Sequence, residues 1–251
     1  MQLPPHVHPR LPTIRFRLAL LVLSCVLPAA IVSAFLIYDH YRVERASLLG
    51  EAMATARSMV AVVDRDFDTV VTALTALSVS DDIDEAEMAE FGRQAANVHA
   101  ILPITEIVLY EAQSGRQLMN TAQEAQAKPV AAPANTALLR EVLRTTQPVV
   151  TGLTRGSAGQ TITVGVPVVR NGAVRYVLAA QVLPESLNAI LRDQQVPATW
   201  RATILDAGLR IVARNVDTER YRGTLPDAGL VERMRRQVED TFDGATVDGN
   251  R

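Results

Sequence analysis

The sequence predicts an α+β protein in which an N-terminal transmembrane helix leads into a long stalk helix and then into two tandem modules with antiparallel sheets, the second of them incomplete. Three observations predict this architecture: an uncharged apolar run near the N-terminus, a sustained heptad pattern after it, and two similar strand–turn–strand patterns about 95 residues apart. We expect five segments: a cytoplasmic tail at 1–17, the transmembrane helix at 18–38, the stalk helix and a following helix at 39–100, a membrane-distal module at 101–197 and a partial membrane-proximal module at 198–251.

Composition limits the class of protein. The chain has 251 residues, of which 48% are hydrophobic and 21% charged, so it is foldable and not disordered. Its formal net charge of -2 argues against a nucleic-acid partner, which attracts a basic surface. Because Cys25 is the single cysteine, an intramolecular disulfide framework and a cysteine zinc cluster are excluded.

The apolar run at 18–38 predicts a membrane span. Its 21 residues carry no charge and, as a helix, cover the roughly 30 Å of a hydrocarbon core. Three arginines and no acidic residue precede it, which places the N-terminus in the cytoplasm and everything after Tyr38 outside the inner (cell) membrane. The alternative is a signal peptide cleaved near Ala34, but the run continues to Ile37, longer than a signal core.

Residues 39–78 predict the stalk helix, continuous with the membrane helix. They contain no proline, and apolar residues recur at spacings of four and three for about four heptads. This seam either pairs with a second copy of the chain, giving a homodimer, or packs on the chain's own downstream domain, and both are open along different stretches. The seam consists of Leu49, Met53, Ala56, Val60, Val63, Phe67, Val70, Leu74 and Leu77.

The membrane-distal module begins after a second helix, for which Asp82 and Glu85 have capping-box spacing and which extends to about Ala100. Strands are predicted at 104–110, 117–121 and 149–153, with a helix at 136–145. Alternating apolar residues at 160–169 and 173–182 flank Asn171-Gly172, the favoured type I′ turn, and predict a long hairpin in which Pro167 marks an edge or a bulge. Pro184 then opens a helix to about residue 195.

The second module repeats the first. Residues 202–206 and 208–213 match 107–111 and 115–120 as strand, acidic residue, glycine-containing turn, arginine and strand. A helix at 230–240 and a strand near 245–247 complete what we expect of it. Because no second long hairpin follows, we expect Arg251 to be a truncation point.

These features together resemble the double Cache (PAS-like) periplasmic sensor region of a bacterial sensor histidine kinase of the HWE or a related type. The resemblance is carried by residues 108–112 with 115–121, by 165–168, by the long helix and by the hairpin. It implies a second membrane helix and a cytoplasmic kinase that follow in such proteins. Chemoreceptors and diguanylate cyclases use similar sensors, and a membrane-anchored binding protein without an output domain is a further alternative.

The chemistry expected of the chain is binding. No nucleotide-binding, hydrolase or metalloprotease motif is present, so we predict no catalytic residue, no metal site and no cofactor. The signal is a small molecule of unknown identity. The polar face of the long hairpin and nearby residues are the candidate ligand site, with an arginine clamping a carboxylate, although a solvated sheet face explains the same pattern. The candidates are Tyr110, Arg155, Thr161, Thr163, Arg175 and Gln181.

Overall fold

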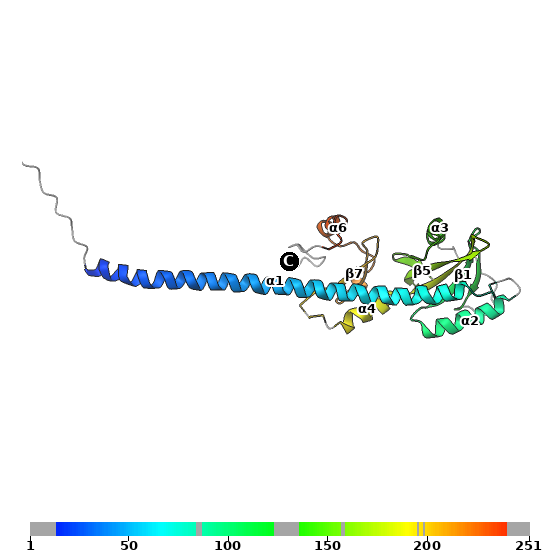
Figure 1. Cartoon of the computed structure of the whole chain (residues 1–251), viewed down its shortest axis with the longest axis horizontal. Coiled ribbons are helices and arrows are strands. Elements are labelled where there is room, and N and C mark those ends of the chain that lie inside the picture. The colour runs from blue at the N-terminus through cyan, green and yellow to red at the C-terminus, as the bar shows by residue number, and fades with distance from the viewer. Residues whose placement is uncertain are drawn as a thin grey trace, which may run out of the picture. The chain divides into compact units, whose positions relative to one another are not determined.

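The computed structural model describes residues 14–83, 87–122, 136–156, 159–194, 196–197 and 199–239, without the side chains at 14–22, 24, 25, 29, 42, 43, 45 and 46 (Figure 1). The chain divides into two compact units, Met1–Ala54 and Thr55–Arg251. In chain order the elements are α1 (Ile14–Ser78), α2 (Met88–Ile101), β1 (Glu106–Glu111), β2 (Gln117–Asn120), α3 (Thr136–Thr145), β3 (Val149–Val150), β4 (Thr154–Gly156), β5 (Gly159–Arg170), β6 (Ala173–Val182), α4 (Pro184–Asp193), β7 (Thr203–Leu205), β8 (Ile211–Arg214), α5 (Thr218–Tyr221) and α6 (Ala228–Met234).

Helix α1 is 65 residues long and contains Pro28. The predicted helix at 39–78 is therefore confirmed, together with its continuity into the segment before it. Among the residues that the structure describes, no helix has both the length and the apolar character needed to cross a bilayer. The predicted span at 18–38 falls partly outside them, since the side chains of 18–22, 24, 25 and 29 are not described.

The main sheet lies in the second unit and has the strand order β2-β1-β6-β5-β3, with β4 also paired to β5. Its centre is the antiparallel β5–β6 hairpin. Asn171 and Gly172 at the tip have φ values of 53° and 78°, the two positive angles of a type I′ turn, so the predicted hairpin is confirmed. Strand β3 pairs with β5 only at Val164 and Gly165, so among the described strands none lies beside Pro167 on that side of β5.

The sheet is covered on both faces, as Figure 1 shows. One face packs on the last turns of α1 and on α2, in a core that includes Leu74, Phe91 and Leu178. The other face packs on α3, where Leu138 and Val142 meet Val108 and other strand residues. Because successive residues of a strand point to opposite faces, the two cores alternate along β1 and β6. Two-sided burial explains why these strands are largely apolar.

The sequence left open whether the heptad seam of α1 pairs with a second copy of the chain or packs on the chain's own domain. The structure decides this for part of the seam. From Val63 onward it packs on the chain's own domain: Phe67, Val70, Leu74 and Leu77 contact the sheet core, and Val63 contacts a second core around α4 and β8. Ala56 and Val60 are exposed, as is Leu49 in the first unit, whereas Met53 is half-buried. Intramolecular packing is therefore confirmed for the last part of the seam.

The end of α1 is held from the sheet. No basic residue lies in the last turn of α1, where helix carbonyl groups lack partners. Arg170, at the tip of the β5–β6 hairpin, donates from Nη1 to the Ser78 carbonyl oxygen at 3.1 Å and from Nη2 to that of Ser80 at 2.7 Å. A cation from a distant strand thus caps this helix end.

We expect Arg170→Met to lower the free energy of unfolding by about 1–3 kcal/mol, because the substitution keeps the aliphatic stem but leaves these carbonyl groups without a charged donor. Chemical denaturation of the chain followed by circular dichroism measures the loss. The exposed Arg155→Met is the matched control and should change it by no more than about 0.5 kcal/mol. Equal effects of the two substitutions would contradict the capping role.

The predicted start of the second helix is wrong. Helix α2 begins at Met88, and Glu87 precedes it without a side-chain capping bond. Asp82 lies in a turn, where its Oδ2 accepts hydrogen bonds from Gln94 Nε2 and from Ser80 Oγ (the latter at 3.3 Å), so it ties the end of α1 to α2 rather than capping a helix. Glu85, its predicted capping-box partner, lies outside the described residues.

The predicted repeat is visible as a second hairpin. Strands β7 and β8 pair antiparallel like β1 and β2, and the register shifts between Ile204 and Leu205 as it does between Leu109 and Tyr110. These positions are 95 residues apart, which matches the predicted offset. In both turns the acidic residue donates its backbone N–H to an arginine carbonyl, from Glu111 to Arg116 at 2.9 Å and from Asp206 to Arg210 at 2.9 Å.

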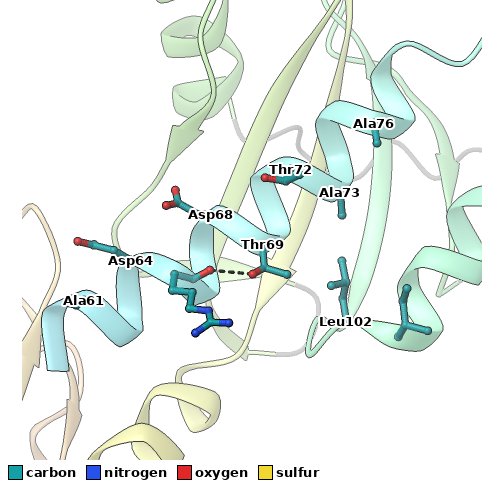
Figure 2. A pocket seen from close by; sticks show the side chains of 10 residues that line it. Ala61, Asp64, Asp68, Thr69, Thr72, Ala73, Ala76 and Leu102 are labelled. Carbon is teal, nitrogen blue, oxygen red and sulfur yellow. Dashed lines mark hydrogen bonds between the residues drawn. The ribbon is translucent and has the colours of Figure 1, made fainter. Parts of the chain in front are cut away.

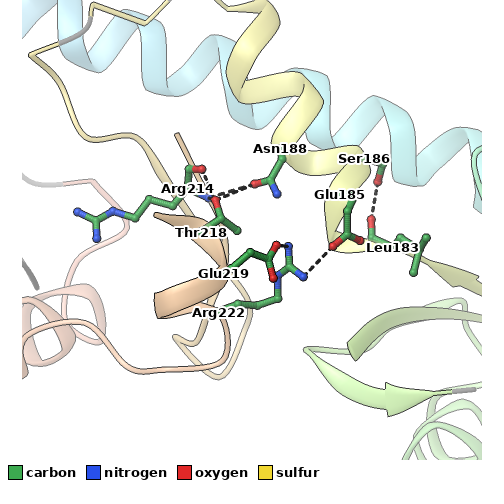
Figure 3. Close-up of polar contacts among 8 residues, drawn as sticks. All are labelled: Leu183, Glu185, Ser186, Asn188, Arg214, Thr218, Glu219 and Arg222. Atoms are coloured by element: carbon green, nitrogen blue, oxygen red, sulfur yellow. Dashed lines mark hydrogen bonds and ion pairs between the residues drawn. The ribbon is translucent and has the colours of Figure 1, made fainter. Parts of the chain in front are cut away.

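The second hairpin is attached to α4 by a polar cluster, shown in Figure 3. Asn188 Oδ1 accepts hydrogen bonds from Arg214 N at 3.3 Å and Thr218 Oγ1 at 3.2 Å. Arg222 forms ion pairs with Glu185 at 2.7 Å and Glu219 at 2.8 Å while its side chain is only 10% exposed. Val212 and Ala213 of β8 pack beside these contacts in the core around α4 and α1.

The bounds of several other helices and strands differ from the predicted ones. Residues 154–156, for which no strand was predicted, form β4 because they pair with 159–161 of β5. Strand β3 is shorter than the predicted 149–153. Helices α4 and α6 end earlier than expected, α5 was not predicted, and β8 begins later. The predicted strand at 245–247 and the tail at 1–13 lie outside the described residues.

Candidate functional site

A row of polar side chains crosses three strands on the α3 side of the sheet. Glu106 in β1 is paired with Gln181 in β6, and Gln181 is paired in turn with Thr163 in β5. We call these three residues the polar row. Glu106 is 4% and Thr163 6% exposed, although burying polar groups costs free energy unless they are hydrogen-bonded. Two of the three residues of the polar row are thus buried polar residues, and their burial needs an explanation.

Amide groups satisfy the carboxylate of the polar row. Asn120 Nδ2 donates to Glu106 Oε2 at 2.8 Å, and Gln181 Nε2 donates to Glu106 Oε1. Because a carboxylate only accepts hydrogen bonds, the nitrogen of the Gln181 amide must face Glu106 and its oxygen must face away. The backbone continues the row: Thr163 N donates to Thr151 Oγ1 at 3.0 Å.

Two buried oxygen atoms beside these bonds have no hydrogen-bond partner among the described residues: Gln181 Oε1 and Thr161 Oγ1. Thr161 is 0% exposed and lies two residues before Thr163, on the same face of β5. Buried polar atoms almost always have a partner, so unpartnered ones mark a place where water or a ligand completes the bonding. Their position next to the polar row makes this the candidate binding site.

The neighbouring row of the same face is apolar and tightly packed. It consists of Val108, Ala179 and Gly165, and Leu138 of α3 packs over it. A Cβ on Gly165 would lie 2.6 Å from Leu138 Cδ1, so glycine is needed for α3 to approach this closely. An apolar wall beside a few fixed polar groups is the usual composition of a small-molecule site.

The structure brings together three of the six residues proposed from sequence and places a fourth on the same face. Thr161, Thr163 and Gln181 form one patch, and Tyr110 shares its face, four residues along β1 from Glu106 or about 14 Å. Two were not foreseen, Glu106 and Asn120. Because alternate residues of a strand share a face, Glu106 lies on the same face as Val108 and the candidate Tyr110. This alternation in the sequence could have identified Glu106 as a site residue.

The two arginines do not join this patch. Arg175 is exposed and lies six residues from Gln181 along β6, about 20 Å away. Arg155 is exposed in β4, opposite Gln160. An arginine clamp on a carboxylate at the polar row is therefore not supported by this geometry.

Tyr110 is expected to make the free energy of unfolding depend on pH. Burial, and secondarily the charge of Glu106, raise the pKa of Tyr110. The unfolded chain then loses this proton at lower pH than the folded chain, so the free energy of unfolding falls as the pH rises above about 10. We expect Tyr110→Phe to reduce this fall, as measured by denaturation at pH 9 to 11. Identical pH profiles for both proteins would show that Tyr110 does not contribute.

A separate shallow groove of about 610 Å³ follows the outward face of α1, as Figure 2 shows. Small side chains and the charges of Asp64, Arg65 and Asp68 form its floor, and Ile101 and Leu102 form one side. None of the ligand-site candidates lies in it. Its open form and mixed lining distinguish it from the buried polar row.

Solved structures resemble the chain, whereas no protein-family model and no curated protein sequence matches it. The ligand-binding domain of the Campylobacter jejuni chemoreceptor Tlp3, in complex with L-valine, superposes with a TM-score of 0.58 at 14% identity over 73% of this chain and 77% of that one. The chain has the fold of these bacterial sensor domains.

Two further structures agree. The ligand-binding domain of the Pseudomonas aeruginosa amino acid chemoreceptor PctC, in complex with GABA, gives a TM-score of 0.52 at 22% identity over 68% of this chain and 76% of that one. The sensor domain of the V. cholerae histidine kinase DctB gives 0.56 at 13% identity over 76% of each. The predicted sensor fold is thereby confirmed, while these identities are too low to carry over a ligand or an output domain.

Proposed function

We propose that the chain is the extracytoplasmic ligand-sensing region of a membrane-bound signal-transduction receptor, with the polar row as part of its ligand site. The observation that carries this is the pair of unpartnered buried oxygens, Gln181 Oε1 and Thr161 Oγ1, on one face of a sheet that has a sensor-domain fold. The opposite face packs on α1, so a change at the site acts on the sheet that holds this helix.

Ligand binding is tested by thermal unfolding of the full chain in detergent with a panel of small amines, carboxylates and amino acids. A ligand of the folded state raises the unfolding free energy by about 2.7 kcal/mol at one hundred times its dissociation constant. We expect at least one compound to raise the melting temperature, with a smaller effect in Thr163→Val. Thr203→Val, on the exposed face of β7, is the matched control and should retain it. A flat response across the panel would overturn the proposal.

We propose a histidine kinase of the HWE or a related type as the output domain. The kinase sensor domain among the similar structures supports a kinase, and the sequence resemblance supports the type. A chemoreceptor is the second candidate, because two of the similar structures are chemoreceptor domains. The reading frame beyond codon 251 separates them: a second apolar run followed by a phosphoacceptor histidine supports the kinase, and a chemoreceptor signalling domain contradicts it.

We also propose that residues 18–38 anchor the chain in the inner membrane, with the N-terminus in the cytoplasm. The uncharged run and the arginines before it support this placement. A phosphatase domain fused after Arg251 is expected to be active in intact bacteria, and one fused after Arg17 inactive. The reverse pattern, or release of a protein that begins after Ala34, would contradict the anchor.

A homodimer through α1 is proposed for the part of the seam that does not pack on the domain. Val60 is 59% exposed, whereas Phe67 contacts the chain's own core. In a Cys25→Ser background, Val60→Cys is expected to form an intermolecular disulfide in membranes and Phe67→Cys is not. Absence of crosslinking at Val60, or equal crosslinking at both, would contradict this interface.

A further inference from the structure

The unpartnered atoms define what a ligand of the polar row must offer. Gln181 Oε1 can only accept a hydrogen bond, because the nitrogen of the same amide is committed to Glu106. Thr161 Oγ1 can accept as well. These residues are diagonal neighbours across β5 and β6, so their Cα atoms lie about 7–8 Å apart, within reach of a single small head group. Gln181 Oε1 therefore requires a hydrogen-bond donor from a ligand, and a head group with a second donor can also reach Thr161 Oγ1.

The charge that Glu106 places at the site is negative. Glu106 lies in the row itself, and burial strengthens its field because water is largely excluded. The same charge contributes to the raised pKa of Tyr110, on the same face. Within the described part of this face, the residues in register beside the row are the uncharged Val108, Ala179 and Gly165, and both candidate arginines are exposed elsewhere. A second carboxylate would be repelled here, whereas a cation would be attracted.

We propose that the polar row binds a small primary amine, whose protonated nitrogen donates to Gln181 Oε1 and Thr161 Oγ1 in the field of Glu106. This rests on the proposed sensor function and names the ligand class of its site. An ammonium group supplies three donors and a positive charge, which matches two acceptors beside a carboxylate.

The test compares ligands of equal length with different head groups by calorimetry on the full chain in detergent. The probes are butylamine and 1,4-diaminobutane, their acid counterparts butyrate and succinate, and the neutral butan-1-ol. A sixth probe, butyltrimethylammonium, keeps the charge but has no N–H donor. We expect binding of the two primary amines, with at least tenfold weaker binding of the acids, the alcohol and the quaternary amine.

Two near-isosteric variants locate the site. Glu106→Gln removes the charge and Thr161→Val removes one acceptor, and each is expected to weaken butylamine binding at least tenfold, whereas the exposed Arg155→Gln leaves it unchanged. Circular dichroism shows whether each variant is folded. If Glu106→Gln does not fold, Thr161→Val alone tests the proposal. Binding of an acid with unchanged affinity in Thr161→Val would overturn the amine inference and leave the sensor function standing. If none of these probes binds and no compound of the ligand panel raises the melting temperature, the amine inference and the proposed sensor function are both overturned.

Discussion

Replacing Leu74 with alanine is expected to lower the free energy of unfolding by about 2–5 kcal/mol. Leu74 is 0% exposed and lies in the core that α1 shares with α2 and the sheet. Removal of its side chain forfeits buried apolar area and leaves a cavity that the surrounding strands fill only in part. The loss is intramolecular, so it should not depend on protein concentration.

Val60→Ala is the matched control on the same seam. Val60 is exposed, so its truncation should change the stability of the single chain by no more than about 0.5 kcal/mol. Guanidinium denaturation followed by circular dichroism, at two protein concentrations, measures both variants. A large effect at Val60, or an effect at Leu74 that grows on dilution, would mean that the whole seam is intermolecular and that α1 does not pack as described.

The contact between Gly165 and Leu138 is expected to give strong energetic coupling between β5 and α3. Gly165→Ala should cost about 1–3 kcal/mol, because its Cβ would lie 2.6 Å from Leu138 Cδ1 and α3 would have to shift. Leu138→Ala alone should cost about 2–5 kcal/mol through the cavity it leaves. In the double variant the new methyl group occupies space that Leu138 has vacated.

The double variant should therefore lose less than the sum of the two single losses, by about 0.5–3 kcal/mol. Denaturation of the four proteins in this cycle measures the coupling. Gly172→Ala is a useful comparison, because Gly172 has a positive φ but nothing within 4 Å of an added Cβ. Gly172→Ala should lower the free energy of unfolding by the same amount in the wild-type chain and in the Leu138→Ala background. Strict additivity for Gly165 and Leu138 would contradict the close approach of α3.

Both predictions bear on how the site relates to the long helix. The polar row and Leu138 share one face of the sheet, and Leu74 packs against the other, so the same three strands separate the proposed ligand site from α1. Arg170 adds a direct bond from the β5–β6 hairpin to the end of that helix. A change in sheet position upon binding thus has a physical route to α1.

Local patterns were sufficient for the elements whose bounds are set by neighbouring residues. Helix α3 and strand β6 have the predicted bounds, 136–145 and 173–182, because a strong periodicity and a defined turn determine them within a few residues. The Asn171-Gly172 turn was predictable for the same reason. The start of α2 was not, because Asp82 bonds to Gln94 on another element instead of capping its own segment.

What the sequence by itself determined is the order and period of the elements: a long helix, a central hairpin and a repeated strand–turn–strand unit, each readable from neighbouring residues. The tertiary structure alone decided which partner each face received. The seam of α1 is equally apolar at Val60 and Leu74, yet only the sheet's position buries one and exposes the other. Likewise Glu106, Gln181 and Thr163 are far apart in sequence, and strand register brings them into one row because pairing across a sheet is non-local.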